Sequence, residues 1–330
     1  MDQVLYASAT IIVGVFGCVA YFYLSNIALD TVFPARGVNA ARNITRANAI
    51  RPWLFLGPAL AFLTMYLVYP VVTSAWLSLH DSQGQTWIGL ENYRWLFADG
   101  KFQESVVNNL MWLIVVPAAA TFLGLITAAL TDRIAWGNIA KSLIFMPMAI
   151  SFVGASVIWK FVYDYRGTDQ DQIGLLNAVV IGLGGEPQAW ITLPFWNNFF
   201  LMMILIWIQT GFAMVILSAA LRGIPEETIE AAILDGANPL QIFWRIKIPQ
   251  IWGTIAVVWT TITILVLKIF DIVFAMTNGQ WETQVLANYM FDKLFRANDW
   301  GMGSASAMII MLLVTPILVW NVRNARKEMS

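Results

Sequence analysis

The sequence predicts an all-α integral membrane protein with about seven transmembrane helices. Hydrophobic residues make up 59% of the 330 residues, and charged residues make up only 12%. An average soluble domain carries about 25% charged residues, so a soluble fold of this length could not bury so much apolar surface. The mean hydropathy is +0.67, and the apolar residues gather in runs long enough to cross a bilayer.

Seven apolar runs approach or exceed the roughly 20 residues that a membrane helix needs. They cover residues 4–24, 53–79, 105–130, 142–163, 199–221, 252–276 and 302–322. Several contain proline, which packed membrane helices tolerate because neighbouring groups satisfy the freed backbone. We expect a kink or a tilt in the second run, which is long and contains Pro58 and Pro70.

The first run is predicted to be a true span and not a signal peptide. A signal peptide places basic residues before its apolar stretch. Here Asp2 precedes the run, and the basic residues follow it, at Arg36, Arg42, Arg46 and Arg51. Residues 1–52 are therefore predicted to form an extra N-terminal transmembrane helix with a basic cytoplasmic linker, and residues 53–330 to form the main membrane domain.

The charges of the connecting segments predict the orientation. Loops on one side are basic, with Arg133 and Lys141, then Arg222, Arg245 and Lys247, then Arg323, Arg326 and Lys327. Loops 80–104, 164–198 and 277–301, on the other side, are rich in Asp and Glu. Because basic loops stay in the cytoplasm, we expect the C-terminus inside and the N-terminus outside.

Composition and motifs argue against several other functions. The net charge of −1 gives no basic surface for nucleic acid. His80 is the only histidine, and we expect it to be solvated at the end of a span, so no metal site or catalytic constellation is predicted. The single cysteine, Cys18, cannot form an intrachain disulfide. The chain also lacks a GxxxxGK[ST] phosphate-binding loop.

The cytoplasmic segment 222–251, RGIPEETIEAAILDGANPLQIFWRIKIPQI, is predicted to form two short helices. Pro225 suits the first position of a helix, and the glutamates after it favour the positive end of the helix dipole. Gly236 suits the end of this helix. Asn238 suits the cap of a second helix that begins at Pro239 and ends at Pro249. From these signals alone, the segment could be either an ordinary connector or a docking surface.

The same segment resembles the EAA loop of binding-protein-dependent ABC importer permeases. The family pattern is EAA, three residues, Gly, nine residues, Ile, any residue and Leu-Pro. Here Glu230-Ala231-Ala232 is followed by Gly236, and Ile246 precedes Lys247, Ile248 and Pro249, so Ile248 replaces the usual leucine. The resemblance implies a coupling helix that docks on a separate ATPase through Glu230, Ala231, Ala232, Asp235, Gly236, Ile248 and Pro249.

Further stretches look like sugar permeases of the maltose-transporter type. They are FMPMAISFVGASVIWKFVYD (145–164), GFAMVILSAALRGIP (211–225) and FDIVFAMTNG (270–279). The segment FPARGVNAARNITRANAIRPWLF, with the extra span before it, looks most like the alpha-glucoside branch. The resemblance implies the type I ABC importer permease architecture for residues 53–330, in a bacterial inner membrane.

The resemblance also implies partners. They would be a second permease subunit, two ATPase subunits that bind ATP and Mg²⁺, and an extracytoplasmic solute-binding protein that delivers a sugar, such as an alpha-glucoside. The chain itself would be a transport subunit and not an enzyme.

Polar and aromatic residues within the spans are candidates for the sugar path. Charged residues in a span are costly and are usually functional. Lys268 and Asp271 are three residues apart, so we expect them on one helix face as an ion pair that either clamps helices or lines the path. The remaining candidates are Asn108, Asn109, Trp207, Gln209, Phe212 and Phe270. The alternative function is an ion-coupled secondary transporter that uses Lys268 and Asp271, although the inverted repeats common in that class are not evident.

Overall fold

The computed structural model describes residues 2–36, 40–167 and 170–329, which are almost entirely helical. The chain divides into two compact units, Met1–Thr73 and Ser74–Ser330. The predicted boundary after residue 52 falls inside a continuous helix, α2 (Ala40–Leu63). The division into an extra N-terminal helix and a permease domain therefore stays a prediction about function.

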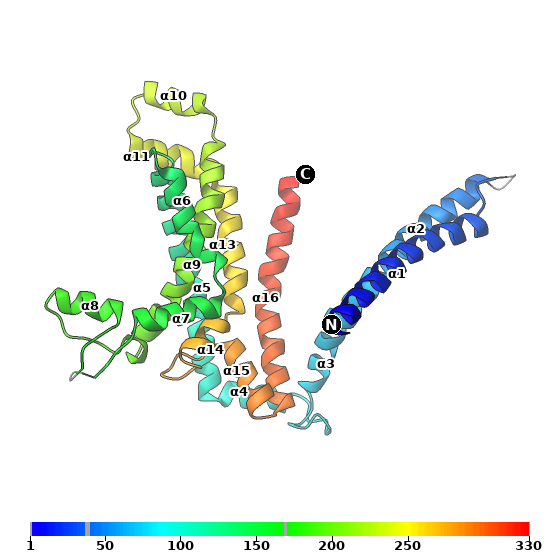
Figure 1. Cartoon of the computed structure of the whole chain (residues 1–330), viewed down its shortest axis with the longest axis horizontal. Helices are drawn as coiled ribbons and strands as arrows, with labels where there is room; N and C mark the ends of the chain where they lie inside the picture. Colours follow the sequence, from blue (N-terminus) through cyan, green and yellow to red (C-terminus); the bar gives the residue numbers. More distant parts are fainter. Residues whose placement is uncertain (1, 37–39, 168–169, 330) are drawn as a thin grey trace. The chain divides into compact units, whose positions relative to one another are not determined.

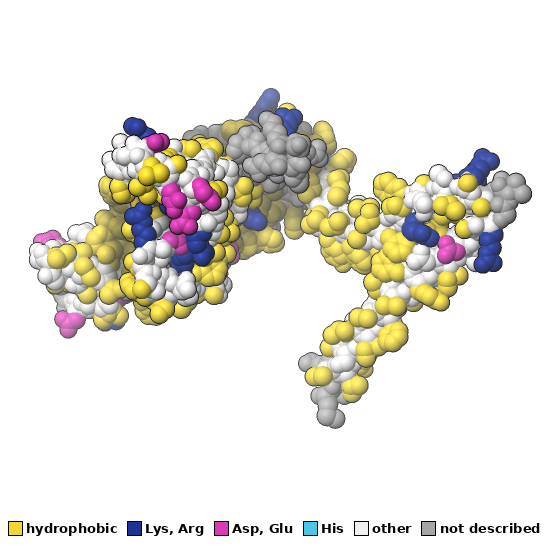
Figure 2. All heavy atoms as spheres, turned by 90° about the horizontal axis from the view of Figure 1, so that it is seen from above, with side chains coloured by type: hydrophobic (Ala, Val, Ile, Leu, Met, Phe, Trp, Pro, Cys, Tyr) yellow, Lys and Arg dark blue, Asp and Glu magenta, His cyan; other side chains and the backbone are white. Residues whose placement is uncertain are grey.

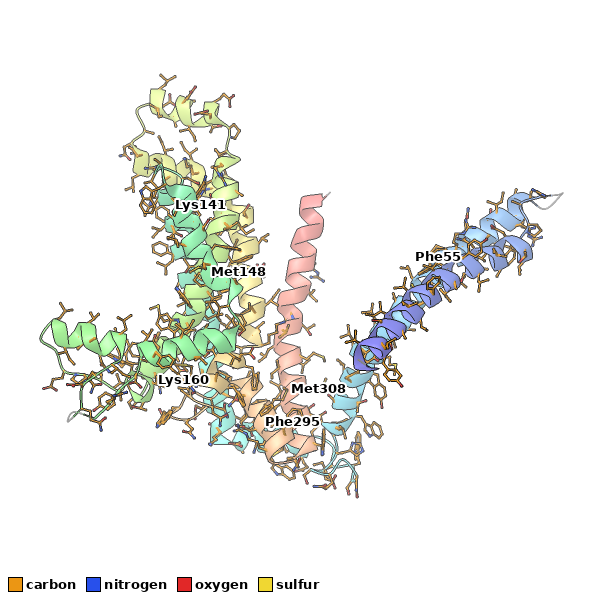
Figure 3. All side chains as sticks on the ribbon, viewed as in Figure 1. Phe55, Lys141, Met148, Lys160, Phe295 and Met308 are labelled. Atoms are coloured by element: carbon orange, nitrogen blue, oxygen red, sulfur yellow. The ribbon has the colours of Figure 1, made fainter. Side chains whose placement is uncertain are left out.

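The N-terminal unit contains a helical hairpin. Helix α1 (Asp2–Val32) lies against α2, where the Tyr21 hydroxyl donates to the carbonyl of Leu54 at 2.9 Å and Arg51 pairs with Asp30 at 3.2 Å. Phe55, labelled in Figure 3, lies with its ring 5.2 Å from that of Phe22. Most other side chains of the unit are apolar and exposed, as Figure 2 shows, which suits contact with lipid.

Proline shapes the second predicted span. After α2 the chain forms a π-helical segment, η1 (Thr64–Val68), and then α3 (Tyr69–Leu77). Pro70 lacks the N–H that would bond to the carbonyl four residues earlier, and a wider turn before it relieves the clash with its ring. The structure thus shows a π-helical turn in this span, while the expected kink or tilt stays a prediction.

The second unit is built on two long helices that pack along most of their length. They are α5 (Gly100–Thr131) and α9 (Trp196–Arg222), and α13 (Trp252–Leu267) packs against both. Their buried side chains form one apolar core, which includes Trp112. Small residues allow the close approach, since a Cβ on Gly124 would meet Ala213 and would lie 2.9 Å from the backbone nitrogen of Met214.

The fourth predicted span is not a straight helix. Helix α6 (Gly137–Phe145) leads through a 3₁₀ turn, η2 (Met146–Ala149), into α7 (Phe152–Val162), and α6 and α7 bend by 106°. Figure 3 labels Lys141 before, Met148 at and Lys160 after this corner. Pro147 lies at the start of the 3₁₀ turn, and the hydroxyl of Ser151 caps α7 by accepting from the N–H of Gly154 at 3.0 Å.

The remaining elements lie at the two ends of the bundle or beside it. Figure 1 shows α10 (Glu226–Leu234) and α11 (Pro239–Gln241) at one end, and α4 (Glu91–Ala98), α14 (Asp271–Met276) and α15 (Leu286–Phe291) at the other. Helix α8 (Leu175–Gly182) projects beside α7, and η3 (Trp190–Thr192) precedes α9. After the π-helical turn η5 (Asp292–Arg296), α16 (Trp300–Met329) runs back along the bundle.

The helices are consistent with about seven spans. In the part of the chain that the structure describes, four are long and apolar enough to cross a membrane, at Val4–Val32, Ala40–Leu77, Gly100–Thr131 and Trp196–Arg222. Two bent pairs pass the same test as single spans, and Trp300–Pro316 is a shorter apolar segment. The predicted sixth span, 252–276, is broken, because α13 ends at Leu267 and α14 begins at Asp271.

The expectation that His80 is solvated is wrong. Its side chain is buried, its Nδ1 lies 2.7 Å from the carbonyl of Trp76, and its ring packs in one group with those of Trp76 and Trp87. The carbonyl of His80 also accepts from the side chain of Asn92 at 2.7 Å. The histidine is thus a packing residue of the turn that precedes α4, and folding of that turn removes it from water.

Candidate functional site: the helical loop and the interior of the bundle

The loop between α9 and α13 has the two-helix form that its sequence predicts. Helix α10 begins at Glu226, with Pro225 at the capping position before it. The helix ends at a left-handed glycine, Gly236, with φ of +82°. The N–H of Gly236 bonds to the carbonyl of Ile233, and the N–H of Ala237 bonds to the carbonyl of Ala232, both at 3.0 Å. This pair of bonds is the Schellman motif, which satisfies carbonyls that would otherwise lack partners.

The second helix of the loop is capped as predicted. The side chain of Asn238 accepts from the N–H of Gln241, and the side chain of Gln241 accepts from the N–H of Asn238. The helix then widens into a π-helical turn, η4 (Ile242–Lys247), before α12 (Ile248–Gln250). Pro249 accounts for the widening in the same way as Pro70, and the helix ends just after it.

The loop exposes apolar side chains away from the bundle. Ala232 is buried, whereas Glu230, Ala231, Asp235 and Gly236 are exposed. Four large apolar side chains on the same loop are also exposed: Ile233, Leu234 (89% exposed), Leu240 and Trp244. The sequence analysis did not identify these four residues. Ile233 and Leu234 could have indicated an exposed apolar surface, because a short helix buries only one side and adjacent residues point to different sides.

Asp132 joins the ends of three helices of the bundle near the loop. It lies at the end of α5, pairs with Lys141 of α6 and accepts from the hydroxyl of Ser218 of α9 at 2.9 Å. Beside it lies a cavity of about 170 Å³. Its lining comes from the ends of α5 and α9 and from η4: Ala129, Asp132, Arg133, Leu221, Arg222, Phe243 and Lys247. The η4 segment of the loop thus faces the ends of the two central helices across this cavity.

The predicted ion pair between Lys268 and Asp271 does not form. Lys268 directly follows the last residue of α13, and Asp271 is the first residue of α14, so the two do not share a helix face. Within the described part of the chain, the ion pairs involve other residues. The spacing argument assumed one continuous helix, and the break at residues 268–270 removes that assumption.

The other predicted path residues lie in three places. Gln209 is buried on α9, and Trp207 and Phe212 of the same helix are partly buried. The ring of Trp207 lies 5.8 Å from that of Trp159 on α7. Phe270 lies in an aromatic group with Phe274 and Phe291, away from these residues in the chain.

Asn108 and Asn109 lie near the start of α5 and hold the loop before α15. The side chain of Asn108 donates to the carbonyls of Glu282 and Gln284 at 3.0 and 2.8 Å. The side-chain oxygen of Asn109 accepts from the N–H of Leu286 at 2.8 Å. The sequence predicts path residues at both positions. The loop to which Asn108 bonds is 174 residues away in the chain, and no local sequence pattern indicates such a distant partner.

An apolar helical bundle with a capped two-helix loop at one end is the architecture of a membrane transport subunit. Comparison with known proteins gives the family. The chain belongs to the binding-protein-dependent transport system inner membrane components, whose family model matches residues 106–327. It is therefore a multi-pass inner-membrane permease subunit of the ABC importer type, as the EAA pattern predicted.

Two curated relatives and one solved structure illustrate the similarity. The chain is 69% identical to the alpha-glucoside transport system permease protein AglF of Rhizobium meliloti (strain 1021), over 99% of both chains. It is 50% identical to the osmoprotective compounds uptake permease protein GgtC of Synechocystis sp., over 83% of this chain and 99% of that one. A bacterial ABC transporter that imports the polysaccharide alginate has a chain of the same fold, with a TM-score of 0.72, 20% identity and coverage of 86% of this chain and 98% of that one.

Proposed function

We propose that this permease imports alpha-glucosides, with energy from a separate ATPase that docks on the α10–α11 loop. The 69% identity with an alpha-glucoside permease, which extends over 99% of both chains, is the observation that carries the substrate class. The partners would be a second permease subunit, two ATPase subunits and an extracytoplasmic solute-binding protein. Another solved alginate transporter is described in complex with a periplasmic protein, which supports the last of these.

Uptake by a strain that lacks this gene tests the substrate class. We expect the strain to lose ATP-dependent accumulation of radiolabelled maltose, sucrose or trehalose, and the restored gene to recover it. Beta-linked cellobiose is the matched control for linkage. The 50% identity to an osmoprotectant permease makes osmoprotective compounds the second candidate substrate class. Loss of glycine betaine uptake, with alpha-glucoside uptake unchanged, would favour that candidate over ours.

The loop helices support the proposed ATPase contact. Glu230, Ala231, Asp235 and Gly236 are exposed together with Ile233, Leu234 and Leu240, whereas Ala232 is buried, and Ile248 and Pro249 belong to the segment that returns to the bundle. Figure 2, viewed onto this end, shows acidic and hydrophobic side chains side by side. Exposed apolar side chains of this kind mark interaction surfaces more often than isolated ones do.

Leu234→Asp tests this contact without disturbing the fold, because Leu234 is 89% exposed. Burial of a leucine contributes about 1.5–3 kcal/mol, so we expect affinity for the ATPase to fall about tenfold or more. Leu183→Asp, at a site 85% exposed outside the loop, is the matched control. Co-purification measures this contact. If the same amount of ATPase co-purifies with the parent and with both variants, docking at Leu234 is contradicted.

Gly236 provides a second test of the loop. Valine disfavours the left-handed conformation, which asparagine tolerates. A Cβ at this position would meet no atom within 4 Å, so the effect of a substitution comes from the backbone and not from a clash. We expect Gly236→Val to insert in the membrane but to transport poorly, and Gly236→Asn to retain most transport. Equal transport by both variants would show that the turn is not required for coupling.

The path residues remain part of the proposal. Trp207, Gln209 and Phe212 on α9 support a path beside this helix, because aromatic faces and amide groups bind sugars. Lys268, Phe270 and Asp271 would lie farther along it, near the break between α13 and α14. The ion-coupled alternative no longer has its ion pair, and the family to which the chain belongs depends on binding proteins.

A further inference from the structure

The loop between α14 and α15 is held in a strained conformation. Trp281 and Glu282 have φ values of +53° and +60°, which side chains other than glycine rarely adopt. Such a backbone conformation is unfavourable for a residue with a side chain and persists only where its surroundings impose it. Here the surroundings are asparagine side chains of α5 and α9 that bond to the loop backbone: Asn108, Asn109, Asn197 and Asn198. These hydrogen bonds therefore fix the loop backbone at Glu282.

Glu282 lies at the wall of a cavity of about 460 Å³ between the loop, α5 and α9. This volume is in the range of small-molecule sites, about 300–1,000 Å³. The lining residues are Glu104, Val107, Asn108, Met111, Phe195, Asn198 and Glu282. Phe195, directly before α9, is itself held at φ of +66° and is 58% exposed.

The polar groups of the cavity act mainly as hydrogen-bond acceptors. The Oδ1 atom of Asn198 is buried without a partner among the described residues, and the residue is only 2% exposed. One carboxylate oxygen of Glu104 accepts from the N–H of Gln284, which leaves the other available. The Glu282 carboxylate has no hydrogen bond or ion pair within the described part of the chain. The amide donors of Asn108 are already used by loop carbonyls.

We propose that this cavity is a binding subsite for a neutral sugar, separate from the path residues at the middle of α9. Sugar hydroxyls can donate to the two carboxylates, while Val107, Met111 and Phe195 contact the C–H face of the ring. Two carboxylates without a basic lining residue disfavour anionic ligands. The proposal rests on the proposed function, because that function supplies the sugar.

The position of the cavity fits a step before passage through the bundle. Asn198 and Gln209 are eleven residues apart on α9, which places them on nearly the same face of the helix and about 16 Å apart along it. The residues that line the cavity belong to α5, the start of α9 and the α14–α15 loop. Figure 1 shows α14 and α15 at the end of the bundle opposite the α10–α11 loop. A sugar released at this end would thus occupy the subsite before it reaches Gln209.

Binding of radiolabelled maltose to the complete importer in nanodiscs, without ATP, tests the subsite. We expect Glu104→Gln combined with Glu282→Gln to weaken maltose binding about tenfold. The glutamine that replaces Glu104 keeps a side-chain oxygen that can still accept from the N–H of Gln284, so the loop should stay in place. Glu186→Gln, an exposed charge change outside the cavity, is the matched control and should bind like the parent.

Cysteine protection locates the bound sugar. Val107→Cys, in a Cys18→Ser background, places a thiol in the cavity wall, and we expect maltose to slow its reaction with a maleimide several-fold. The protection should disappear in the double glutamine variant. Protection by Na⁺ or Ca²⁺ but not by maltose would overturn the proposal in favour of a cation site.

The remaining outcomes separate the subsite from the proposed function. An importer that takes up maltose normally but shows neither protection nor weaker binding in the double variant overturns the subsite alone. A parent importer that transports no alpha-glucoside overturns the proposed function and, with it, the sugar subsite.

Discussion

Individual polar side chains make contacts that their spacing in the sequence does not indicate. The asparagines at the start of α5, which the sequence predicts to line the path, also bond to a distant loop, and Asn108 lines the cavity beside Glu282. It predicts that Lys268 and Asp271 pair, yet a break between two helices separates them. In both cases the hydrogen-bond partner or the helix break is not encoded in the motif itself.

The absence of an ion pair between Lys268 and Asp271 has a measurable consequence. Residues that do not interact contribute additively to stability, within about 0.5 kcal/mol. We therefore expect Lys268→Met and Asp271→Asn to have additive effects on the thermal stability of the purified importer. A coupling energy above about 1 kcal/mol in the double-mutant cycle would instead indicate the ion pair that the sequence predicts.

Asp99 lies at the opposite end of the bundle from the α10–α11 loop. Its environment predicts that the stability of the folded protein depends on pH. Burial alone would raise its pKa, but hydrogen bonds from the Tyr289 hydroxyl and the Lys101 N–H, together with the charge of Lys293, lower the pKa below its usual value. A lowered carboxylate pKa stabilises the folded protein above the unfolded value of about 3.9, and the effect is lost as pH falls through the folded value.

Tyr289→Phe tests this contact. Loss of a hydrogen bond to a charged group costs about 1.5–3 kcal/mol near neutral pH. The cost should shrink as pH falls through the lowered folded pKa of Asp99, because the carboxyl then becomes protonated in both proteins. Thermal unfolding at several pH values measures the difference. A constant difference between the two proteins at all pH values would assign the loss to packing instead.

At the scale of elements, proline and glycine decide where the helices depart from straight rods. Pro70 and Pro249 each follow a π-helical turn, and Pro147 lies at the start of the 3₁₀ turn at the 106° corner. Hydropathy identifies such segments as apolar runs but does not report whether the helix within a run is straight, bent or broken. The predicted spans are therefore consistent with the structure in number, at about seven, while the structure bends the fourth and breaks the sixth.

The close approach of α5 and α9 predicts that a side chain added at Gly124 lowers the stability of the protein. An added Cβ would meet Ala213 and the Met214 backbone, and overpacking of this kind costs about 1–3 kcal/mol. We expect Gly124→Ala to unfold at a lower temperature than the parent in detergent. Gly14→Ala, where a Cβ would meet nothing within 4 Å, should be neutral. Equal stability of both variants would mean that the two helices are not in contact at Gly124.

At the scale of the whole molecule, an odd number of spans places the two termini on opposite sides of the membrane. The charge asymmetry of the loops then predicts the C-terminus in the cytoplasm. We expect a reporter after Ser330 to be active in the cytoplasm and a tag before Asp2 to be reached by a protease added to intact spheroplasts. Protection of that tag would mean that the first apolar run does not cross the membrane or that the span count is even.

The sequence by itself determined the class, the approximate span number and the two-helix form of the 222–251 loop, because these depend on local patterns. Hydropathy reports burial in lipid, and the caps at Gly236 and Asn238 act within one turn. Only the tertiary structure decided the burial of His80, the separation of Lys268 from Asp271 and the cavity beside Glu282. These three features depend on contacts between distant segments of the chain or on a break in a helix. A distant contact and a helix break leave no periodic signal in the sequence.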